Sequence, residues 1–279
     1  MIKAFHINST APFFASNQQD LYKQDDFDLF CSVLSALAWQ RAGGSISMIT
    51  DKTGLEFYKS QNLCTIWDGG VLPILEEVPS IDNIAFWAAG KLFALQTQNA
   101  PCVMMDTDFI AWEIPEFEEG ITVAHREPVN PSVYPDKSAF KMNENYIFPK
   151  DALWSELPCN TAFAYFDNDD FKNYYTSSAF DFMKNANHCD NVLTYMVFAE
   201  QRLLAMCAAE KGVKINSLLD YSKLEASKKY THLWGYKQIL RENENERTAF
   251  CSRCALRIES DFSEYVTTLK KSETLGIYF

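Results

Sequence analysis

The first 108 residues alternate short apolar segments with helical ones, and this order constrains the fold more than any other feature. Residues 2–8, 45–49 and 102–105 are predicted strands. Residues 27–40 carry apolar side chains at the spacing of an amphipathic helix, and residues 81–98 form a second predicted helix. Strands that alternate with helices favour a parallel sheet with right-handed crossovers. We therefore expect an α/β fold with a mainly parallel central sheet.

The remaining pattern continues this architecture with one interruption. The further predicted segments are a short helix at 54–61, strands at 64–67, 120–124, 161–166 and 213–215, and helices at 169–185 and 192–211. Residues 126–156 are rich in Pro, Asn and aromatic residues and are expected to form an irregular excursion over the sheet. We expect one domain at 1–240 and a helical C-terminal extension at 241–279 packed on that domain.

Composition and charge exclude several classes of protein. Apolar residues make up 47% of the chain and charged residues 22%, which is typical of a globular protein. The formal net charge of −12 disfavours binding to nucleic acid or to anionic membranes. A protein of this charge that handles anionic nucleotides needs a metal ion or a few well-placed cations, so a carboxylate-bound metal is of particular interest.

The chain shows no targeting or membrane signal. The N-terminus lacks the apolar region of a signal peptide, and no segment reaches the roughly 18 apolar residues that span a bilayer. Most of the eight cysteines lie in apolar stretches, as reduced core cysteines do. Cys251 and Cys254 form a single C-x-x-C without a second pair for zinc. These features predict a cytoplasmic protein without a transmembrane segment.

Two carboxylates follow the predicted strand at 102–105. In extended geometry alternate side chains share a face, so Asp106 and Asp108 can point the same way. Hard oxygen ligands at the carboxyl end of a strand suit Mg²⁺ or Mn²⁺ and leave room for phosphate oxygens. The alternative is an ordinary Asp-rich turn.

A second group of candidate residues lies far downstream, in the pattern H-x-x-G-x-K formed by His232, Gly235 and Lys237. A neutral imidazole can complete a metal site that carboxylates begin. Glycine allows the backbone to approach a phosphate, and lysine supplies a positive charge for a departing diphosphate. Each residue alone is equally typical of a hydrogen-bonded histidine, a turn and a solvated charge.

With these two motifs the chain resembles the retaining GT-A glycosyltransferases related to glycogenin and to the lipopolysaccharide galactosyltransferases. The resemblance runs in order over residues 2–240 and implies a Rossmann-like GT-A fold. It implies that Asp106, Asp108 and His232 bind the metal. It also implies that Asp106, Asp108, Gly235 and Lys237 hold the diphosphate of a nucleotide sugar.

Further residues take roles from the resemblance alone. Asn160 begins a segment similar to the family's Asn-Ala-Gly, which lines the donor sugar and the acceptor. Glu200 and Gln201 resemble the family's Asp-Gln, which implies that Gln201 lies by the anomeric centre and Glu200 by the sugar hydroxyls. Asn-Thr-Ala in place of Asn-Ala-Gly, Glu-Gln in place of Asp-Gln, and the lack of Pro-Trp after Lys237 are departures from the family's pattern.

Three more residues are expected to contact the donor. Lys91, in the helix before the D-x-D, resembles a basic residue that reaches the donor. Asn8 and Ser9, after the first strand, stand where relatives contact the nucleotide base or ribose. A solvated helix charge and a loop cap are the alternatives for these positions.

The expected function is therefore metal-dependent transfer of a sugar from a nucleotide diphosphate donor, such as a UDP-sugar, to the hydroxyl of a glycan or other acceptor, with retention. Mn²⁺ or Mg²⁺ is the expected cofactor. The expected acceptor platform is the set of aromatic residues Tyr134, Phe140, Tyr146, Phe148 and Trp154, with packing of a long loop as the alternative. The rival functions are a catalytically silent binder of nucleotide sugars or glycans, and a nucleotidyltransferase, which the lack of a Gly-rich basic loop after the first strand disfavours.

Overall fold

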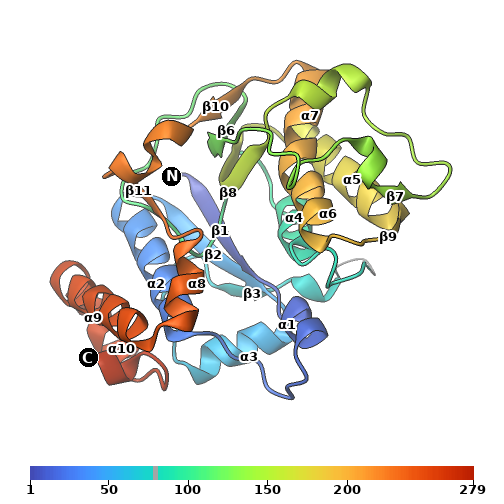
Figure 1. Ribbon diagram of the computed structural model, residues 1–279. Coiled ribbons are helices and arrows are strands. Elements are labelled where there is room, and N and C mark those ends of the chain that lie inside the picture. Colours follow the sequence, from blue (N-terminus) through green and yellow to red (C-terminus); the bar gives the residue numbers. More distant parts are fainter. Residues whose placement is uncertain (78–80) are drawn as a thin grey trace.

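A computed structural model describes residues 1–77 and 81–279. Its centre is a seven-stranded sheet (Figure 1), in which the strands lie in the order β10, β6, β8, β4, β1, β2 and β3. In chain order these strands are β1 (Lys3–Asn8), β2 (Ser45–Thr50), β3 (Val71–Pro73), β4 (Cys102–Met105), β6 (Ile121–Arg126), β8 (Cys159–Phe166) and β10 (Ile215–Ser217).

Most of the neighbouring strands run parallel, which confirms the predicted α/β class with its mainly parallel central sheet flanked by helices. The pairs β1–β2, β1–β4, β2–β3 and β6–β10 are parallel, whereas β8 is antiparallel to both β4 and β6. Because β8 is reversed, its first residues lie at the same edge of the sheet as the last residues of β4 and β6. This edge is where the candidate site forms.

Helices cover both faces of the sheet (Figure 1). Each face of the sheet has its own cluster of buried side chains. The first cluster includes residues of α2 (Asp26–Arg41) and α9 (Glu244–Asp261), and the second includes residues of α4 (Ala89–Thr97) and α5 (Asp169–Asn185). The second face also carries a continuous stretch made of α6 (Val192–Val197), a π-helical turn (Phe198–Arg202) and α7 (Leu203–Lys211). The remaining α-helices are α1 (Ala11–Ser16), α3 (Lys52–Ser60), α8 (Tyr236–Glu242) and α10 (Val266–Leu269).

The expectation of an amphipathic helix at 27–40 is wrong in one respect, because α2 is buried on nearly every side. Its side chains from Phe27 to Trp39 are buried, with the exception of Asp28. The cause is α9, which packs against α2 and buries Cys251 and Cys254 there. All eight cysteines are free, and these two thiols are part of the core.

Three local expectations differ from the structure. Residues 64–67 form turns, and the edge strand of the sheet is β3 instead. Residues 83–88 are also turns, because the Asp82 carboxylate accepts hydrogen bonds from the backbone N–H groups of Ile84 and Ala85, so the helix begins only at Ala89. The short strand predicted at 213–215 lies two residues later, as β10.

Two small sheets accompany the main one. The strands β5 (Phe109–Ala111) and β11 (Tyr230–His232) pair in an antiparallel fashion, with His232 opposite Phe109. The strands β7 (Lys141–Met142) and β9 (Ala186–His188) form the second small sheet. The first of these pairings brings a distant part of the chain beside the end of β4.

One helical stretch in the described part of the chain is long and apolar enough to cross a membrane by length and composition. It is Val192–Lys211, and 78% of its apolar window is buried inside the protein. Such burial is typical of a core helix.

A buried histidine connects β1 with α2. The indole N–H of Trp67 donates to Nδ1 of His6 at 3.1 Å, so the other nitrogen, Nε2, carries the proton and donates to Ser35 Oγ at 3.0 Å. Ser35 in turn donates to the carbonyl of Phe109 at 2.5 Å. Burial lowers the pKa of His6 to about 3, against a weaker opposite effect of Asp108. A proton on Nδ1 would face the indole N–H, so the folded protein keeps His6 neutral.

This histidine predicts a loss of stability in mild acid. The unfolded chain binds a proton at His6 below pH 6.5, whereas the folded chain does so only near pH 3. The free energy of unfolding therefore falls as the pH drops through this window, by up to about 1.4 kcal/mol per pH unit. Urea unfolding of the wild type and of His6→Gln between pH 7.5 and 5 measures this slope. The variant should show a slope smaller by about one proton, and equal slopes would contradict the assignment.

Candidate active site

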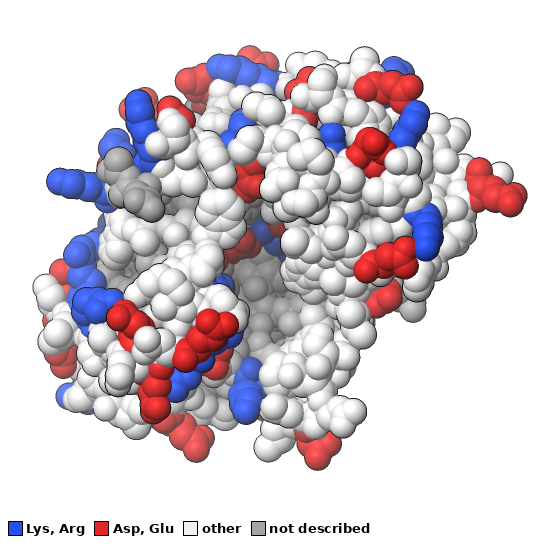
Figure 2. Space-filling view, in the orientation of Figure 1, with Lys and Arg blue, Asp and Glu red and all other residues white. Residues whose placement is uncertain are grey.

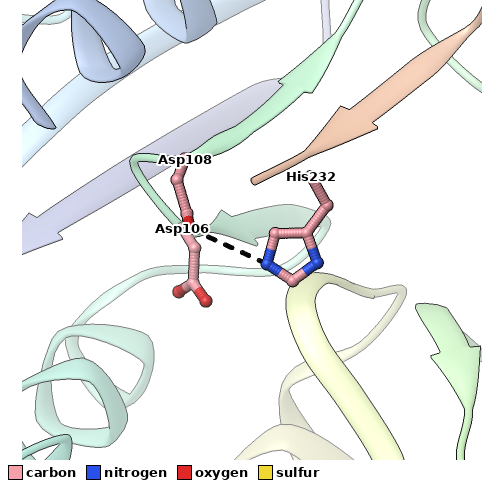
Figure 3. A group of neighbouring side chains, drawn as sticks. All are labelled: Asp106, Asp108 and His232. Atoms are coloured by element: carbon pink, nitrogen blue, oxygen red, sulfur yellow. Dashed lines mark ion pairs between the residues drawn. The ribbon is translucent and has the colours of Figure 1, made fainter. Parts of the chain in front are cut away.

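The end of β4 carries the two aspartates into a tight turn. The backbone N–H of Asp106 donates to the carbonyl of Ala162 in β8, and the N–H of Phe109 returns to the carbonyl of Asp106. The chain then enters β5, whose partner β11 ends at His232. One ligand atom from each of Asp106, Asp108 and His232 lies within 4.8 Å of the other two (Figure 3). Asp108 Oδ2 is 3.9 Å from His232 Nε2.

These three side chains are a suitable donor set for a divalent cation. Two carboxylate oxygens and one imidazole nitrogen are hard or intermediate ligands that Mg²⁺ and Mn²⁺ accept. In octahedral coordination neighbouring and opposite ligand atoms lie roughly 2.9 to 4.2 Å apart, so the observed spacing closes around an ion with a shift of less than about 1 Å. The residues therefore fit the metal that the sequence motif implies.

Burial and neighbouring charges shift the pKa values of these three ligands. Burial lowers the pKa of His232, so its nitrogen is available as a ligand. Burial also acts to raise the pKa of Asp108, but Lys237 and His232 outweigh it and the net pKa lies below the usual value. For Asp106 burial prevails over the attraction of Lys91, and its pKa is raised. Bound metal would favour the ionised form of both carboxylates.

Lys237 lies beside the aspartates, as the motif predicts. Its ammonium group is 3.1 Å from Asp108 Oδ2 and 3.3 Å from Asp28 Oδ1. Gly235 of the same motif behaves differently: its φ is −66°, and an added Cβ would meet no atom within 4 Å. The backbone therefore gives no reason for glycine here. The unusual conformation belongs to the preceding Trp234, with a φ of 37°.

Lys91 connects the first aspartate with the second helical face. Its ammonium group is 2.7 Å from Asp106 Oδ1 and 2.6 Å from Glu200 Oε1, and it also donates to the carbonyl of Thr161. The Thr161 hydroxyl donates to the same Glu200 oxygen at 2.5 Å. Lys91 and Glu200 are both buried. The structure thus excludes the alternative of a solvated helix charge for Lys91.

Glu200 and Gln201 belong to the π-helical turn between α6 and α7. The turn widens the helix for five residues, and such turns often occur at functional sites. The hydroxyl of Tyr175 donates to the carbonyl of Glu200 at 2.6 Å. Both side chains line a cavity of about 830 Å³ above the aspartates, here called the first cavity. Figure 2 shows the hollow in this face of the protein.

The first cavity gathers nearly all the residues that the sequence singled out. Those that line it are Asn8, Ser9, Lys91, Asp106, Asp108, Asn160, Glu200, Gln201, His232 and Lys237. Gly235 lies outside it, in the wall of a second cavity. Residues from β1, β4, β8, β11 and three helical segments therefore meet in one space, although they lie up to 229 positions apart between Asn8 and Lys237.

Asn8 offers a hydrogen-bond donor to a ligand. Its Oδ1 accepts from the hydroxyl of Tyr22 at 2.7 Å, which leaves the amide nitrogen to find a partner. Asn8 is only 9% exposed, and its Nδ2 has no partner among the described residues. A buried donor without a partner is costly, so a bound group that accepts from it would be stabilising.

Two further residues of the cavity wall are Glu127, which the sequence did not single out, and Tyr134, which was expected only as part of the aromatic platform. Asn160 Nδ2 donates to Glu127 Oε1 at 2.9 Å, and the Tyr134 hydroxyl is 2.8 Å from Glu127 Oε2. The same hydroxyl contacts the side-chain amide of Gln201. The Gln201 atom in this contact is Oε1, so the single hydroxyl hydrogen of Tyr134 is shared between this oxygen and the Glu127 carboxylate. Glu127 and Tyr134 thereby orient Gln201.

The expected aromatic acceptor platform is wrong for most of its members. Phe140 is 7% exposed, and its ring packs against Phe182, Tyr195 and Phe198 in the core of the second face. The other side chains of the set that pack on this core are Tyr146, Phe148 and Trp154. These aromatic residues anchor the excursion to the helices, and only Tyr134 reaches the first cavity.

Comparison with known sequences identifies the family. A family described as "Family of unknown function (DUF6734)" matches residues 2–271. The chain belongs to this family. No curated protein matches the chain significantly in sequence.

Similar solved structures are glycosyltransferases at low sequence identity. PaToxG glycosyltransferase is 11% identical, with a TM-score of 0.44 over 80% of this chain and 71% of that one. GlyE of Streptococcus pneumoniae TIGR4 is 9% identical, with a TM-score of 0.39 over 79% of this chain and 46% of that one. Mouse xyloside xylosyltransferase 1, apo form, is 11% identical, with a TM-score of 0.40 over 85% of this chain and 91% of that one.

Proposed function

We propose that the protein is a metal-dependent glycosyltransferase that uses a nucleotide diphosphate sugar, with a UDP-sugar as the favoured donor. The observation that carries this proposal is the meeting of Asp106, Asp108, His232 and Lys237 at one edge of the sheet, beside a cavity of about 830 Å³. A diphosphate needs a cation on each side, and this arrangement offers a metal site and an ammonium group within a few ångströms of each other. The resemblance to the glycogenin and lipopolysaccharide galactosyltransferase family suggests retention of the anomeric configuration.

In the proposed mechanism the metal ligands and Lys237 have separate roles. Asp106, Asp108 and His232 would hold Mn²⁺ or Mg²⁺, and as a Lewis acid this ion would supply stabilisation of the negative charge on the departing diphosphate. Lys237 exchanges its contacts with Asp28 and Asp108 for a phosphate oxygen. The bond between the anomeric carbon and the phosphate oxygen breaks, and the acceptor oxygen bonds to the same face of that carbon. The acceptor proton moves to the departing diphosphate.

The other residues of the first cavity position the donor. Asn8 Nδ2 donates to the base or ribose, with Ser9 beside it, and Asn160 and Glu200 face the sugar. Gln201 offers its amide oxygen to the positive charge that develops at the anomeric carbon. The free cysteines support a cytoplasmic location, which is part of this proposal.

A nucleotide screen tests the proposal. Thermal shifts are measured with UDP, GDP, ADP and their glucose, galactose, N-acetylglucosamine and xylose derivatives, each with and without Mn²⁺. At least one should raise the melting temperature only when metal is present, and that donor should lose its sugar to water or to an acceptor. If none stabilises the protein with metal, the site assignment is wrong. Binding without any release of sugar would favour the silent binder.

A conservative change tests the orientation of Gln201. Burial and the Glu127 carboxylate raise the pKa of Tyr134, so its hydroxyl keeps its proton and can act as a donor. Tyr134→Phe removes the hydrogen bond that fixes the Gln201 amide, a loss of about 1.4 kcal/mol, and turnover should fall about tenfold. The KM for the donor should stay within about twofold. Tyr146→Phe, in the core of the excursion, is the control and should leave both constants unchanged.

A further inference from the structure

The second cavity lies directly beside the proposed metal site. It has a volume of about 730 Å³, and its wall includes His125, Tyr221, Tyr230, His232, Trp234 and Tyr236. Three of these residues, Tyr221, His232 and Trp234, also line the first cavity. The two cavities therefore share one wall, and a ligand in the second can reach the reacting centre in the first.

Two of the shared wall residues are exposed aromatic side chains. Tyr221 is 45% exposed and Trp234 is 47% exposed, which is unusual for rings of this size. The Trp234 ring stacks on His232, with 6.0 Å between ring centroids and 8° between the planes. Trp234 also keeps a positive φ, and such conformations outside glycine concentrate at functional sites. An exposed ring in a costly conformation beside a metal ligand indicates a binding role.

Beneath these rings lies an unsatisfied polar side chain. His125 is 1% exposed, and neither of its nitrogens has a partner among the described residues. The rings of Tyr221 and Trp234 cover it, with centroids 5.5 Å and 5.7 Å from that of His125. Buried imidazoles almost always have hydrogen-bond partners. Burial lowers the pKa of His125, so it offers one donor and one acceptor.

We propose that the second cavity is the acceptor subsite and that it binds a sugar ring of a carbohydrate acceptor. This inference rests on the proposed function. Sugar rings combine apolar faces, which stack on aromatic rings, with hydroxyl groups that both donate and accept. Tyr221 and Trp234 supply the aromatic faces. Hydroxyl groups of the ligand reach His125 when one of the two exposed rings turns aside, one accepting from its N–H and another donating to its unprotonated nitrogen.

Direct measurement of sugar binding tests this subsite separately from catalysis. Maltose, lactose, cellobiose and xylobiose are titrated by saturation-transfer NMR against the wild-type protein, first alone and then with UDP and Mn²⁺ present. We expect at least one disaccharide to bind, and UDP should not displace it. Because sugar binding is read without turnover, a failed donor screen and a failed subsite give different results. If no disaccharide binds to a protein that binds UDP with Mn²⁺, the proposal is overturned.

Three variants locate the binding. Tyr221→Ala and His125→Phe should each weaken disaccharide binding at least tenfold, while UDP binding with Mn²⁺ stays within about twofold. His125→Phe should keep or raise the melting temperature, because it replaces an unsatisfied polar group with an apolar one of similar shape. Trp87→Ala, in the first cavity alone, is the matched control and should leave disaccharide binding unchanged. Retention of binding in both cavity variants, or displacement of the sugar by UDP, would overturn the assignment.

Discussion

An Asp108→Asn variant is expected to lose the metal-dependent part of nucleotide binding and to transfer sugar about a thousandfold more slowly. Asparagine has nearly the same shape as aspartate but no charge, so it is a poor ligand for Mn²⁺. A metal that stabilises the leaving group contributes several kcal/mol to the transition state, and each 1.4 kcal/mol corresponds to about a tenfold change in rate. The measurements are the melting temperature with UDP and Mn²⁺, and the rate of release of sugar from the donor.

A second measurement distinguishes loss of the metal from a general loss of structure. In this variant Lys237 keeps Asp28 as a partner but loses its 3.1 Å contact with Asp108, so its charge becomes more available to a phosphate. Affinity for UDP in the presence of EDTA should therefore stay equal or increase. Asp190→Asn, an exposed carboxylate beside Lys141, is the control and should change neither quantity. If Mn²⁺ still raises UDP affinity in Asp108→Asn, the metal lies elsewhere.

The local part of this site could be predicted from the sequence. The apolar run before Asp106 identifies a buried strand, and the alternation of strands with helices places its end at the ligand-binding edge of the sheet. The position of His232 could not be predicted in this way. It reaches Asp108 through the pairing of β5 with β11, two three-residue strands separated by more than 100 positions, and such short segments carry no register signal.

The direction of β8 also could not be predicted from the sequence. A strand buried on both faces shows the same continuous apolar run in either direction, and the long excursion before it can return the chain to either edge. Yet its antiparallel direction is what brings Asn160 to the site. The strand predicted at 64–67 was wrong for a different reason. The apolar side chains of this segment include Trp67, which is buried because its indole contacts His6 and not because it belongs to a sheet.

The excursion shows why aromatic content alone misleads. Aromatic residues occur both in binding sites and in cores, and only exposure separates the two. Phe140 and its neighbours are hidden under α5 and α6, whereas Tyr221 and Trp234, which the sequence did not mark as aromatic platforms, remain exposed beside the metal ligands. Burial depends on the whole fold, so no local pattern gives it.

Lys91→Met is expected to lower the free energy of unfolding by about 3–5 kcal/mol, because it leaves the buried Glu200 carboxylate and the partly exposed Asp106 carboxylate without their cation. The side chains of Lys91 and Glu200 are each only 9% exposed, and Asp106 shares the same ammonium group. Burial alone would lower the pKa of Lys91, but Asp106 and Glu200 outweigh it and raise the pKa, so the lysine stays charged in the folded protein. Urea unfolding at pH 7.5 measures the change.

A compensating change makes this prediction specific. Lys91→Met combined with Glu200→Gln removes one of the two unpaired charges. The free energy of unfolding of the double variant should therefore be at least about 1 kcal/mol higher than that of Lys91→Met alone, which is the size of coupling expected for groups in contact. Lys59→Met is the matched control, because its pair with Glu56 is exposed and should cost less than about 0.5 kcal/mol. Additive effects of the two substitutions would show that Lys91 does not neutralise Glu200. Recovery would establish that the charge balance inside the first cavity, which Lys91 shares between Asp106 and Glu200, is a condition for the fold as well as for the proposed chemistry.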